Sequence, residues 1–530
     1  MKEPKIVTTT EAELDELLAL AKRSFPAEKY ALLESVLRSF ASVMLLLQNA
    51  KTSIKRLRRT LFGSRTENKD DVLGKVIDAK TENNHGQAAL PLPAIKRDGH
   101  GRNGVKAYSG ATVIRVDHAS LRAGLHCPSC LRGKVYTYDP KIIVRVVGQP
   151  PLSARVYQLG QLRCNLCGEI FTAEAPSEMG ADKYEVSAAS MLAVLRYGAG
   201  VPFYRLEGLQ ASLNMPLPDA TQWDIVSKAA DGPRAVYGEL IRQAAQGELL
   251  HNDDTPMRIL ALMGKRAERA AGDGDKPRAV NTSGIVAVLG EYKIVLFVTG
   301  PKHAGENLRD VLAHRAKTLP PPMQMCDGLS HNTSGEFKTI LANCLVHGRR
   351  QFIDIVDSFP VACRHVIEVL GEVYQNEAYC REQKLSKEAR LSHHQVTSGP
   401  LMESLNAWMT VQLDAREVEP NSNLGKAFAY MLKRWNELTL FLRQAGAPLD
   451  NNLCERALKK AILHRKGSLF YKTQNGAIVG DAYMSLIYTC QVCGKNPFEY
   501  LQALQTHAEK VKRQPHGWLP WNYEAMIVTV

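Results

Sequence analysis

The residues best suited to chemistry in this sequence are acids set among basic side chains, and Glu455 is the clearest case. It lies in the stretch Asp450-Asn-Asn-Leu-Cys-Glu-Arg-Ala-Leu-Lys-Lys460, which predicts a helix with Asp450 as its N-cap. The basic residues that follow Glu455 are Arg456, Lys459, Lys460, Arg465 and Lys466. A carboxylate in such a helix suits a metal ligand beside cations that hold phosphate. The alternative is a surface glutamate that pairs with Lys459 one turn away.

Two aspartates upstream could complete a metal site with Glu455. Asp253 and Asp327 each follow a short apolar run that predicts a strand, so their side chains can project from a sheet edge into one cleft. Three such carboxylates can hold two divalent cations, Mg²⁺ or Mn²⁺, about 4 Å apart, which is the arrangement that catalyses in-line phosphoryl displacement. The alternative is coincidence, because a chain of 530 residues contains many acids.

Four cysteines have the spacing of a structural zinc site. Cys127-Pro-Ser-Cys130 and Cys164-Asn-Leu-Cys167 are separated by a segment that alternates like short strands. Four thiolates complete a tetrahedral zinc ion and leave no open position, so 111–180 is predicted to be a zinc ribbon holding one structural Zn²⁺. Unpaired structural cysteines are the alternative.

A second, weaker metal candidate is Cys344 with His347. Cys326 or Cys363 could complete a second zinc site with this pair. The alternative is that the pair has a structural role and supports the wall of the active site.

Strands and helices must bring the three acids together. The run that ends at Asp253 is the first predicted strand, and further strands are predicted at 284–290, 292–300, 323–328 and 344–348. Helical segments separate the last three of these. Three sequential strands followed by alternating helix and strand describe an α/β layer with a mixed sheet. Residues 352–445 are almost wholly helical, with Trp408 and Trp435 as core residues. One α/β domain is therefore predicted over 233–495, followed by a C-terminal helix and tail at 496–530.

The segment 181–232 is predicted to be a helix-turn-helix. Its second helix would present Thr221, Gln222 and Lys228 to DNA, although many helical hairpins bind nothing.

The N-terminal region 1–62 carries apolar positions at 3,4 spacing from residue 30 to residue 62, including Leu33, Val36, Phe40 and Val43. This is the period of a coiled coil, with packing inside the same chain as the alternative. Residues 63–110 lose that period and are predicted to be a basic flexible linker.

Composition narrows the choice of partner. The formal net charge of +13 favours an acidic partner such as nucleic acid. No run approaches the roughly 18 apolar residues that span a bilayer, and acids replace the apolar core of a signal peptide, so a cytoplasmic protein is expected. Eleven cysteines in such a chain argue against a disulfide framework.

Taken in order, these motifs resemble the large transposase of the IS66 family of bacterial insertion sequences. The resemblance rests on Leu61-Phe62-Gly63-Ser-Arg65, the four-cysteine finger, the segment 201–207 and His251-Asn-Asp-Asp-Thr-Pro256. It continues through Asp327-Gly328, Cys344-Leu-Val-His347-Gly-Arg349-Arg350 and Asp450-Asn-Asn-Leu-Cys-Glu-Arg-Ala-Leu458, followed by Arg465-Lys466 and Leu469-Phe470. It covers nearly the whole chain, and the signature at 450–458 is long enough to be specific.

The resemblance implies that 233–495 is an RNase H-like catalytic core with a DDE triad of Asp253, Asp327 and Glu455, interrupted before Glu455 by a helical insertion at about 352–445. It implies a nucleoid-associated enzyme that binds the terminal inverted repeats of its element in double-stranded DNA, cleaves there and joins the ends to target DNA. A homodimer or higher oligomer on DNA is expected, with accessory proteins from the same element as possible partners. A catalytically inactive DNA-binding repressor and a hydrolytic nuclease are the rival functions.

The same resemblance suggests which side chains surround the triad. Asp254 stands where the family has Glu and could compete with Asp253 as a ligand, and His347 could contact the scissile phosphate. The residues expected to bind DNA are Arg349, Arg350, Arg456, Lys459, Lys460, Arg465 and Lys466.

Overall fold

The computed structural model describes residues 11–43, 113, 120–130, 132–137, 143, 150–163, 170–176, 180, 182–263, 279–335 and 337–528. They belong to two compact units, Met1–Glu82 with Ala154–Val530, and Asn83–Ser153. All three predicted triad residues belong to the first unit. Three predicted features lie outside the described residues. They are the linker at 63–110, the part of the predicted coiled coil at 44–62, and the cysteine pair Cys164 and Cys167.

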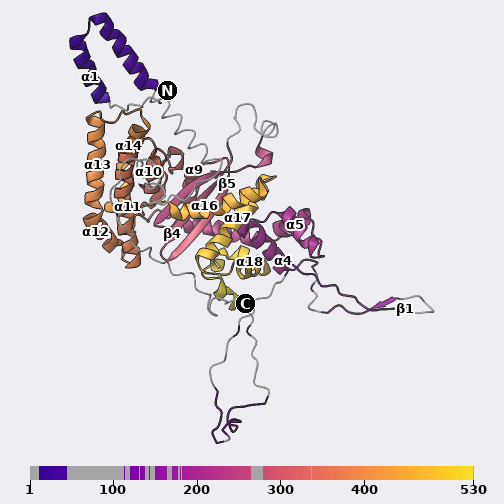
Figure 1. Ribbon diagram of the computed structural model, residues 1–530. Coiled ribbons are helices and arrows are strands. Elements are labelled where there is room, and N and C mark those ends of the chain that lie inside the picture. The colour runs from indigo at the N-terminus through magenta and orange to yellow at the C-terminus, as the bar shows by residue number, and fades with distance from the viewer. Residues whose placement is uncertain are drawn as a thin grey trace. The chain divides into compact units, whose positions relative to one another are not determined.

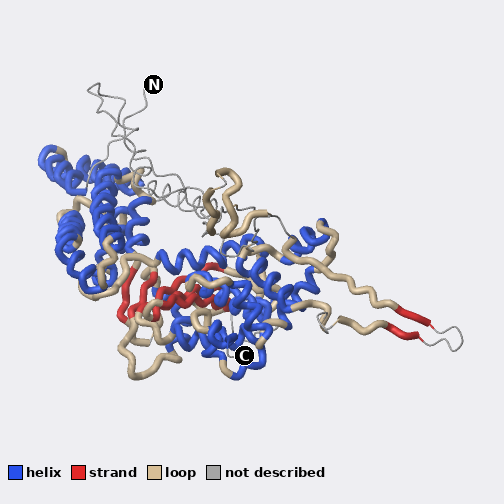
Figure 2. The backbone as a smooth tube through the Cα atoms, turned by 90° about the horizontal axis from the view of Figure 1, so that it is seen from below, coloured by secondary structure: helices blue, strands red, loops and turns tan. Residues whose placement is uncertain are grey.

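A five-stranded mixed sheet carries the first unit (Figures 1 and 2), which confirms the predicted α/β class. The strands are β3 (Leu249–Pro256), β4 (Asn281–Leu289), β5 (Tyr292–Gly300), β6 (Met323–Cys326) and β7 (Ile340–Asn343). Their order is β5-β4-β3-β6-β7. The first three strands are antiparallel neighbours, whereas β6 is parallel to β3 and β7 is parallel to β6.

The prediction of a strand at 344–348 is wrong. The strand that pairs with β6 is β7, and residue 345 already begins helix α10 (Leu345–Ile353). The buried residues of α10 follow the helical period, since they are Leu345, Gly348, Phe352 and Ile353. A short apolar run cannot distinguish these two outcomes by itself.

Helices cover both faces of the sheet beside the predicted site. Helix α16 (Asn452–Ser468) packs on Gly284 of β4, where an added Cβ would come within 2.9 Å of Leu458. Helix α9 (Ala304–Leu312) reaches the neighbouring Ser283, whose hydroxyl accepts a hydrogen bond of 2.8 Å from Asn307. Successive strand residues point to opposite faces, so α9 and α16 lie on opposite sides of the sheet.

Helix α17 (Gln474–Val492) closes the edge of the sheet at β5. Side chains at positions i, i+4 and i+8 of this helix accept the strand's backbone N–H groups. Asp481 binds Thr299 N at 2.6 Å, Ser485 binds Phe297 N at 2.8 Å, and Thr489 binds Val295 N at 3.0 Å. An edge strand with unpaired backbone groups invites aggregation, and α17 removes that hazard here.

Burial raises the pKa of Asp481 to about 8, which gives this closure a pH dependence. The folded state holds the proton more tightly than the unfolded state, so this contribution to stability is present at low pH and is lost as pH rises towards 8. We expect the urea midpoint of the wild type to fall between pH 5.5 and pH 8.5 by more than that of Asp481→Asn. Ser485→Ala is the control, because it removes a hydrogen bond that does not titrate. Equal pH slopes for wild type and Asp481→Asn would contradict this assignment.

The predicted helical insertion is present and has its own core. It contains α11 (Pro360–Glu382), α12 (Lys387–Thr397), α13 (Gly399–Asp414), α14 (Asn423–Lys433), α15 (Trp435–Leu438) and the 3₁₀ turn η6 (Leu440–Leu442). Together with α10 these helices enclose an apolar cluster that includes Phe352, Leu370 and Phe428. Trp408 packs edge-on against Phe428 at 5.3 Å between ring centroids, as expected of a core residue.

The segment predicted as a helix-turn-helix contains several helices, and one of its expected contact residues is unsuitable. The elements are α4 (Val186–Ala193), the π-helical turn η3 (Val194–Gly198), α5 (Phe203–Ser212), α6 (Asp219–Lys228) and α7 (Asp231–Ala244). Gln222 is fully buried and donates to the carbonyls of Phe203 and Leu217, so it holds α5 against α6 and cannot read bases. Lys228 is exposed and Thr221 is partly exposed.

The described N-terminal residues form α1 (Glu11–Ser24) and a second helical stretch at 27–43. In the second stretch the predicted seam residues Val36, Phe40 and Val43 are more than half exposed. At the other end of the chain lie α18 (Pro497–Thr506), α19 (Ala508–Arg513), η7 (Pro515–Trp518) and α20 (Tyr523–Val528). None of the helices in the described part of the chain combines the length and the apolar character needed to cross a bilayer.

Candidate active site

The sheet places Asp253 and Asp327 side by side. Leu249, Leu250 and His251 of β3 pair in parallel with Met323, Gln324 and Met325 of β6. Each aspartate comes two residues after the last of these pairs, so the same register aligns them at the carboxyl ends of adjacent strands. Asp253 still belongs to β3, which continues to Pro256, whereas Asp327 follows β6 directly.

Asn332 bridges the two aspartates, and sequence analysis had missed it. Its amide nitrogen lies 2.8 Å from Oδ1 of Asp327 and 3.4 Å from Oδ1 of Asp253. Backbone N–H groups complete the arrangement, from Leu329 to Asp327 at 3.0 Å and from Asp254 to Asp253 at 2.8 Å. Asn332 is almost fully buried in the 3₁₀ turn η5 (Ser330–Asn332). No periodicity or spacing in the sequence distinguishes it from the other asparagines.

Glu455 lies in the first turn of α16, and Asn451 attaches that turn to the sheet. The buried side chain of Asn451 accepts from Nδ1 of His251 at 3.0 Å and donates to the carbonyl of Asn252 at 3.1 Å. Its backbone N–H lies 3.2 Å from Sγ of Cys344. The sequence predicted Asp450 as the N-cap of this helix. The N-cap in the structure is Asn451.

Asp450 supports this turn in another way. Its carboxylate accepts from the backbone and side-chain nitrogens of Asn452 at 3.1 and 2.7 Å.

His347 and Cys344 adjoin Glu455. Nδ1 of His347 lies 3.9 Å from Oε1 of Glu455, and the two residues with Cys344 offer ligand atoms within 4.8 Å of one another. Burial raises the pKa of Cys344 to about 12, so this sulfur is a thiol in the metal-free protein. The thiol accepts a hydrogen bond from the Asn451 backbone, which favours the supporting role over that of a zinc ligand.

The electrostatics of Asp253 fit a cation site. Burial, together with the charges of Asp327, Asp254 and Glu455, raises the pKa of Asp253 to about 7. Oε1 of Glu455 is buried and accepts no hydrogen bond among the described residues. The negative charges of Asp327, Asp254 and Glu455 are among the causes of this raised pKa, and a divalent cation would offset them.

The three carboxylates do not converge on one point, because no choice of one oxygen from each brings all three within 4.8 Å of one another. These three carboxylates therefore do not form one compact metal-binding group by themselves.

Asp254 points away from this group. Its Oδ2 lies 2.9 Å from Nδ1 of His303 and 3.4 Å from the backbone nitrogen of Ala304, at the start of α9. Since neighbouring strand residues face opposite sides, Asp253 and Asp254 serve different faces of β3.

The basic residues of α16 divide into two groups. Arg456, Lys459 and Lys466 form an exposed stripe along the helix. In contrast, Arg465 donates to Thr255 Oγ1 at 3.0 Å, and the ammonium of Lys460 lies 5.7 Å from the ring centroid of Tyr488. Arg349 and Arg350 belong to α10, the helix that also carries His347.

Backbone hydrogen bonds hold the loop that carries the first cysteine pair. In the unit Asn83–Ser153, the Cys127 backbone donates to the carbonyl of Gly133 at 2.7 Å, and Gly133 N–H lies 3.5 Å from Sγ of Cys130. Hydrogen bonds from this backbone lower the pKa of Cys130, which favours the thiolate that zinc binds. The second pair lies between β1 (Gln161–Arg163) and β2 (Ile170–Thr172), which are antiparallel.

The raised pKa of Asp253 predicts that cation binding depends on pH. Below pH 7 a proton competes with the metal for this carboxylate, so apparent Mg²⁺ affinity should fall by about tenfold per pH unit. Titration calorimetry at pH 6 and pH 8 measures this directly. Asp253→Asn should bind weakly at both values, and Asp254→Asn should keep the wild-type pH dependence. Equal wild-type affinity at pH 6 and pH 8 would contradict the raised pKa on which this prediction rests.

The fold and the site together define a mixed α/β domain with one acid on β3 and a second directly after the neighbouring parallel strand β6. A family model described as the IS66 family of transposases matches residues 183–478, which is more than half of the chain and includes all three acids. The chain therefore belongs to the IS66 transposase family.

Two relatives from Sinorhizobium fredii (strain NBRC 101917 / NGR234) extend the similarity beyond the matched domain. The uncharacterized protein y4jD is 26% identical over 384 residues, which cover 68% of this chain and 71% of y4jD. The uncharacterized protein y4qI is 24% identical over 357 residues, which cover 63% of this chain and 61% of y4qI.

Proposed function

We propose that this chain is a DDE-type DNA transposase whose catalytic domain, 233–495, is RNase H-like. The observation that carries the proposal is the alignment of Asp253 on β3 with Asp327, which directly follows the parallel strand β6, together with the attachment of the Glu455 turn to β3 through Asn451. The sheet order β5-β4-β3-β6-β7 and the helical insertion before Glu455 support it. Membership of the IS66 family supports a transposase function in general.

In this proposal the side chains divide the work of phosphoryl transfer. Asp253, Asp327 and Glu455 would hold two Mg²⁺ or Mn²⁺ ions, which when bound activate the attacking oxygen and stabilise the leaving oxygen. The exposed stripe of Arg456, Lys459 and Lys466 would bind DNA phosphates beside the acids. Water cleaves one strand at each terminal inverted repeat, and the freed 3′-hydroxyl then attacks a phosphodiester bond of the target DNA.

The remaining parts of the chain would recognise and pair the two ends. The zinc ribbon of Cys127, Cys130, Cys164 and Cys167, together with the helices of 181–232, would bind the inverted repeats. The N-terminal helices would join two protomers through the exposed seam of Val36, Phe40 and Val43. The protein would act in the bacterial cytoplasm, on nucleoid DNA, alone or with accessory proteins.

Assays on labelled DNA carrying the inverted repeats that flank the gene for this chain test the proposal. We expect strand cleavage and a joined product with Mg²⁺, and binding without cleavage when Ca²⁺ replaces Mg²⁺. Nicking without a joined product would identify a hydrolytic nuclease. Binding that is never followed by cleavage would identify an inactive DNA-binding repressor and overturn the proposal.

A further inference from the structure

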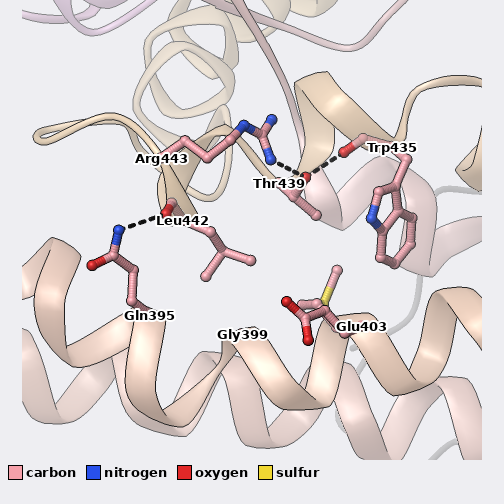
Figure 3. A pocket seen from close by; sticks show the side chains of 8 residues that line it. Gln395, Gly399, Glu403, Trp435, Thr439, Leu442 and Arg443 are labelled. Atoms are coloured by element: carbon pink, nitrogen blue, oxygen red, sulfur yellow. Dashed lines mark hydrogen bonds between the residues drawn. The ribbon is translucent and has the colours of Figure 1, made fainter.

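The helical insertion contains a pocket that the cleavage chemistry leaves unexplained (Figure 3). Its volume is about 380 Å³, near the lower end of the range for small-molecule sites. The lining residues come from α12, α13, α15 and η6 and include Met402, Glu403, Trp435, Leu442 and Arg443. The pocket therefore lies wholly within the insertion.

The pocket combines flat apolar surface with one strong acceptor. The indole of Trp435 and the side chain of Leu442 provide apolar walls, and the carboxylate of Glu403 faces the same space (Figure 3). Met402 also lines the pocket. The side chain of Glu403 is exposed and makes no hydrogen bond or ion pair within the described residues. An ionised carboxylate only accepts hydrogen bonds, so the matching ligand carries N–H donors. The flat indole of Trp435 favours a ligand that is planar.

Hydrogen bonds hold the walls of the pocket in place. Arg443 donates to Thr439 Oγ1 at 3.0 Å, and Thr439 donates in turn to the carbonyl of Trp435 at 2.6 Å. On the other side, Gln395 donates to the carbonyl of Leu442 at 3.1 Å. These bonds connect α12 with η6 and fix the backbone that carries Trp435.

The same backbone is attached to the active site. Arg434, the residue before Trp435, donates to the carbonyl of Gly328 at 3.1 Å, and Tyr430 donates to the carbonyl of Asp327 at 2.8 Å. The guanidinium of Arg434 also lies over the Tyr430 ring at 4.3 Å from its centroid. The segment that presents Trp435 is therefore bound to the loop that carries a triad acid.

We propose that this pocket receives a base extruded from the DNA duplex near the cleaved bond, and that it prefers a base with an exocyclic amino group. The inference rests on the proposed function, since it requires DNA at the triad. Trp435 stacks on the extruded base as aromatic side chains do in single-strand binding sites. Glu403 accepts from the amino group of cytosine, adenine or guanine, which thymine lacks.

Extrusion has a measurable signature, because it costs least where the base is already unpaired. We would place single mismatches at each of the last base pairs of the terminal repeat and measure binding with Ca²⁺, which blocks chemistry. For the wild type, a mismatch at the extruded position should tighten binding by about 10-fold. In Trp435→Ala the same mismatch should change binding little, and Trp435→Phe should keep part of the gain. Trp521→Ala is the matched control, because Trp521 stacks on Tyr292 at 4.8 Å outside the pocket.

Cleavage with Mg²⁺ provides a second readout. Trp435→Ala should cleave fully paired ends about 10- to 100-fold more slowly and should recover on the mismatched end. Glu403→Gln should lose the preference for cytosine, adenine or guanine over thymine at the mismatch, whereas Glu388→Gln on the exposed face of α12 should keep it.

The outcomes separate the pocket from the catalytic proposal. Normal wild-type cleavage with no coupling between Trp435 and any mismatch would overturn the pocket assignment alone. Coupling in the binding assay without any cleavage would retain the pocket and overturn the catalytic proposal. Absence of binding to every end would overturn both.

Discussion

Glu455→Gln should lower Mg²⁺-dependent strand cleavage and strand transfer by at least about 10³-fold, because a metal ion contributes several kcal/mol to such a transition state and each 1.36 kcal/mol is tenfold in rate. The substitution preserves the size of the side chain and removes its charge. Oε1 of Glu455 accepts no hydrogen bond among the described residues, so few native contacts are lost and the fold should remain intact. The expected defect is therefore in metal binding, and not in folding.

Asp450→Asn is the matched control for this substitution. Asp450 lies five residues before Glu455 and uses its carboxylate to accept from Asn452, a role that an amide oxygen can partly fulfil. It should keep activity within a fewfold of the wild type. Cleavage rates on a repeat end, with circular dichroism to monitor folding, distinguish the two variants. A Glu455→Gln protein that still joins DNA ends at the wild-type rate would remove Glu455 from the triad.

Asn451→Ala should destabilise the catalytic domain by about 3 kcal/mol, because two buried hydrogen bonds are lost and their partners stay buried. Those partners are Nδ1 of His251 and the carbonyl of Asn252. Burial lowers the pKa of His251 to about 4, so this imidazole is neutral at pH 7 and donates its Nδ1 proton to Asn451. The variant should also lose much of its Mg²⁺ affinity, because Asn451 attaches the first turn of α16 to the strand that carries Asp253.

Asn452→Ala tests whether these effects belong to the buried contact. Asn452 is exposed and contacts Asp450, so its removal should change stability by no more than about 0.5 kcal/mol. Urea unfolding and Mg²⁺ titration of both variants provide the comparison. Similar losses for Asn451→Ala and Asn452→Ala would mean that the turn as a whole, and not the bond to β3, positions Glu455.

Local sequence patterns were sufficient for the strands and helices that carry the acids. Apolar runs predicted β4, β5 and β6, and the residues after Asp450 predicted α16. Local patterns gave a wrong prediction where the same residues suit either of two structures. Residues 344–348 begin a helix because β7 already pairs with β6, and Gln222 is buried because α5 packs against α6.

The sequence by itself determined the α/β class and the mainly helical stretch before Glu455, because these depend on residue type and spacing within short segments. The choice of Asp253, Asp327 and Glu455 as the three candidate acids rested also on the resemblance to the IS66 family. Only the tertiary structure showed that Asn332 bridges two of the acids and that Asn451 attaches the third to β3. It alone placed Arg434 against Gly328 and so joined the insertion to the site. These contacts connect residues far apart in the chain, and a buried asparagine or arginine has no periodicity that names its partner.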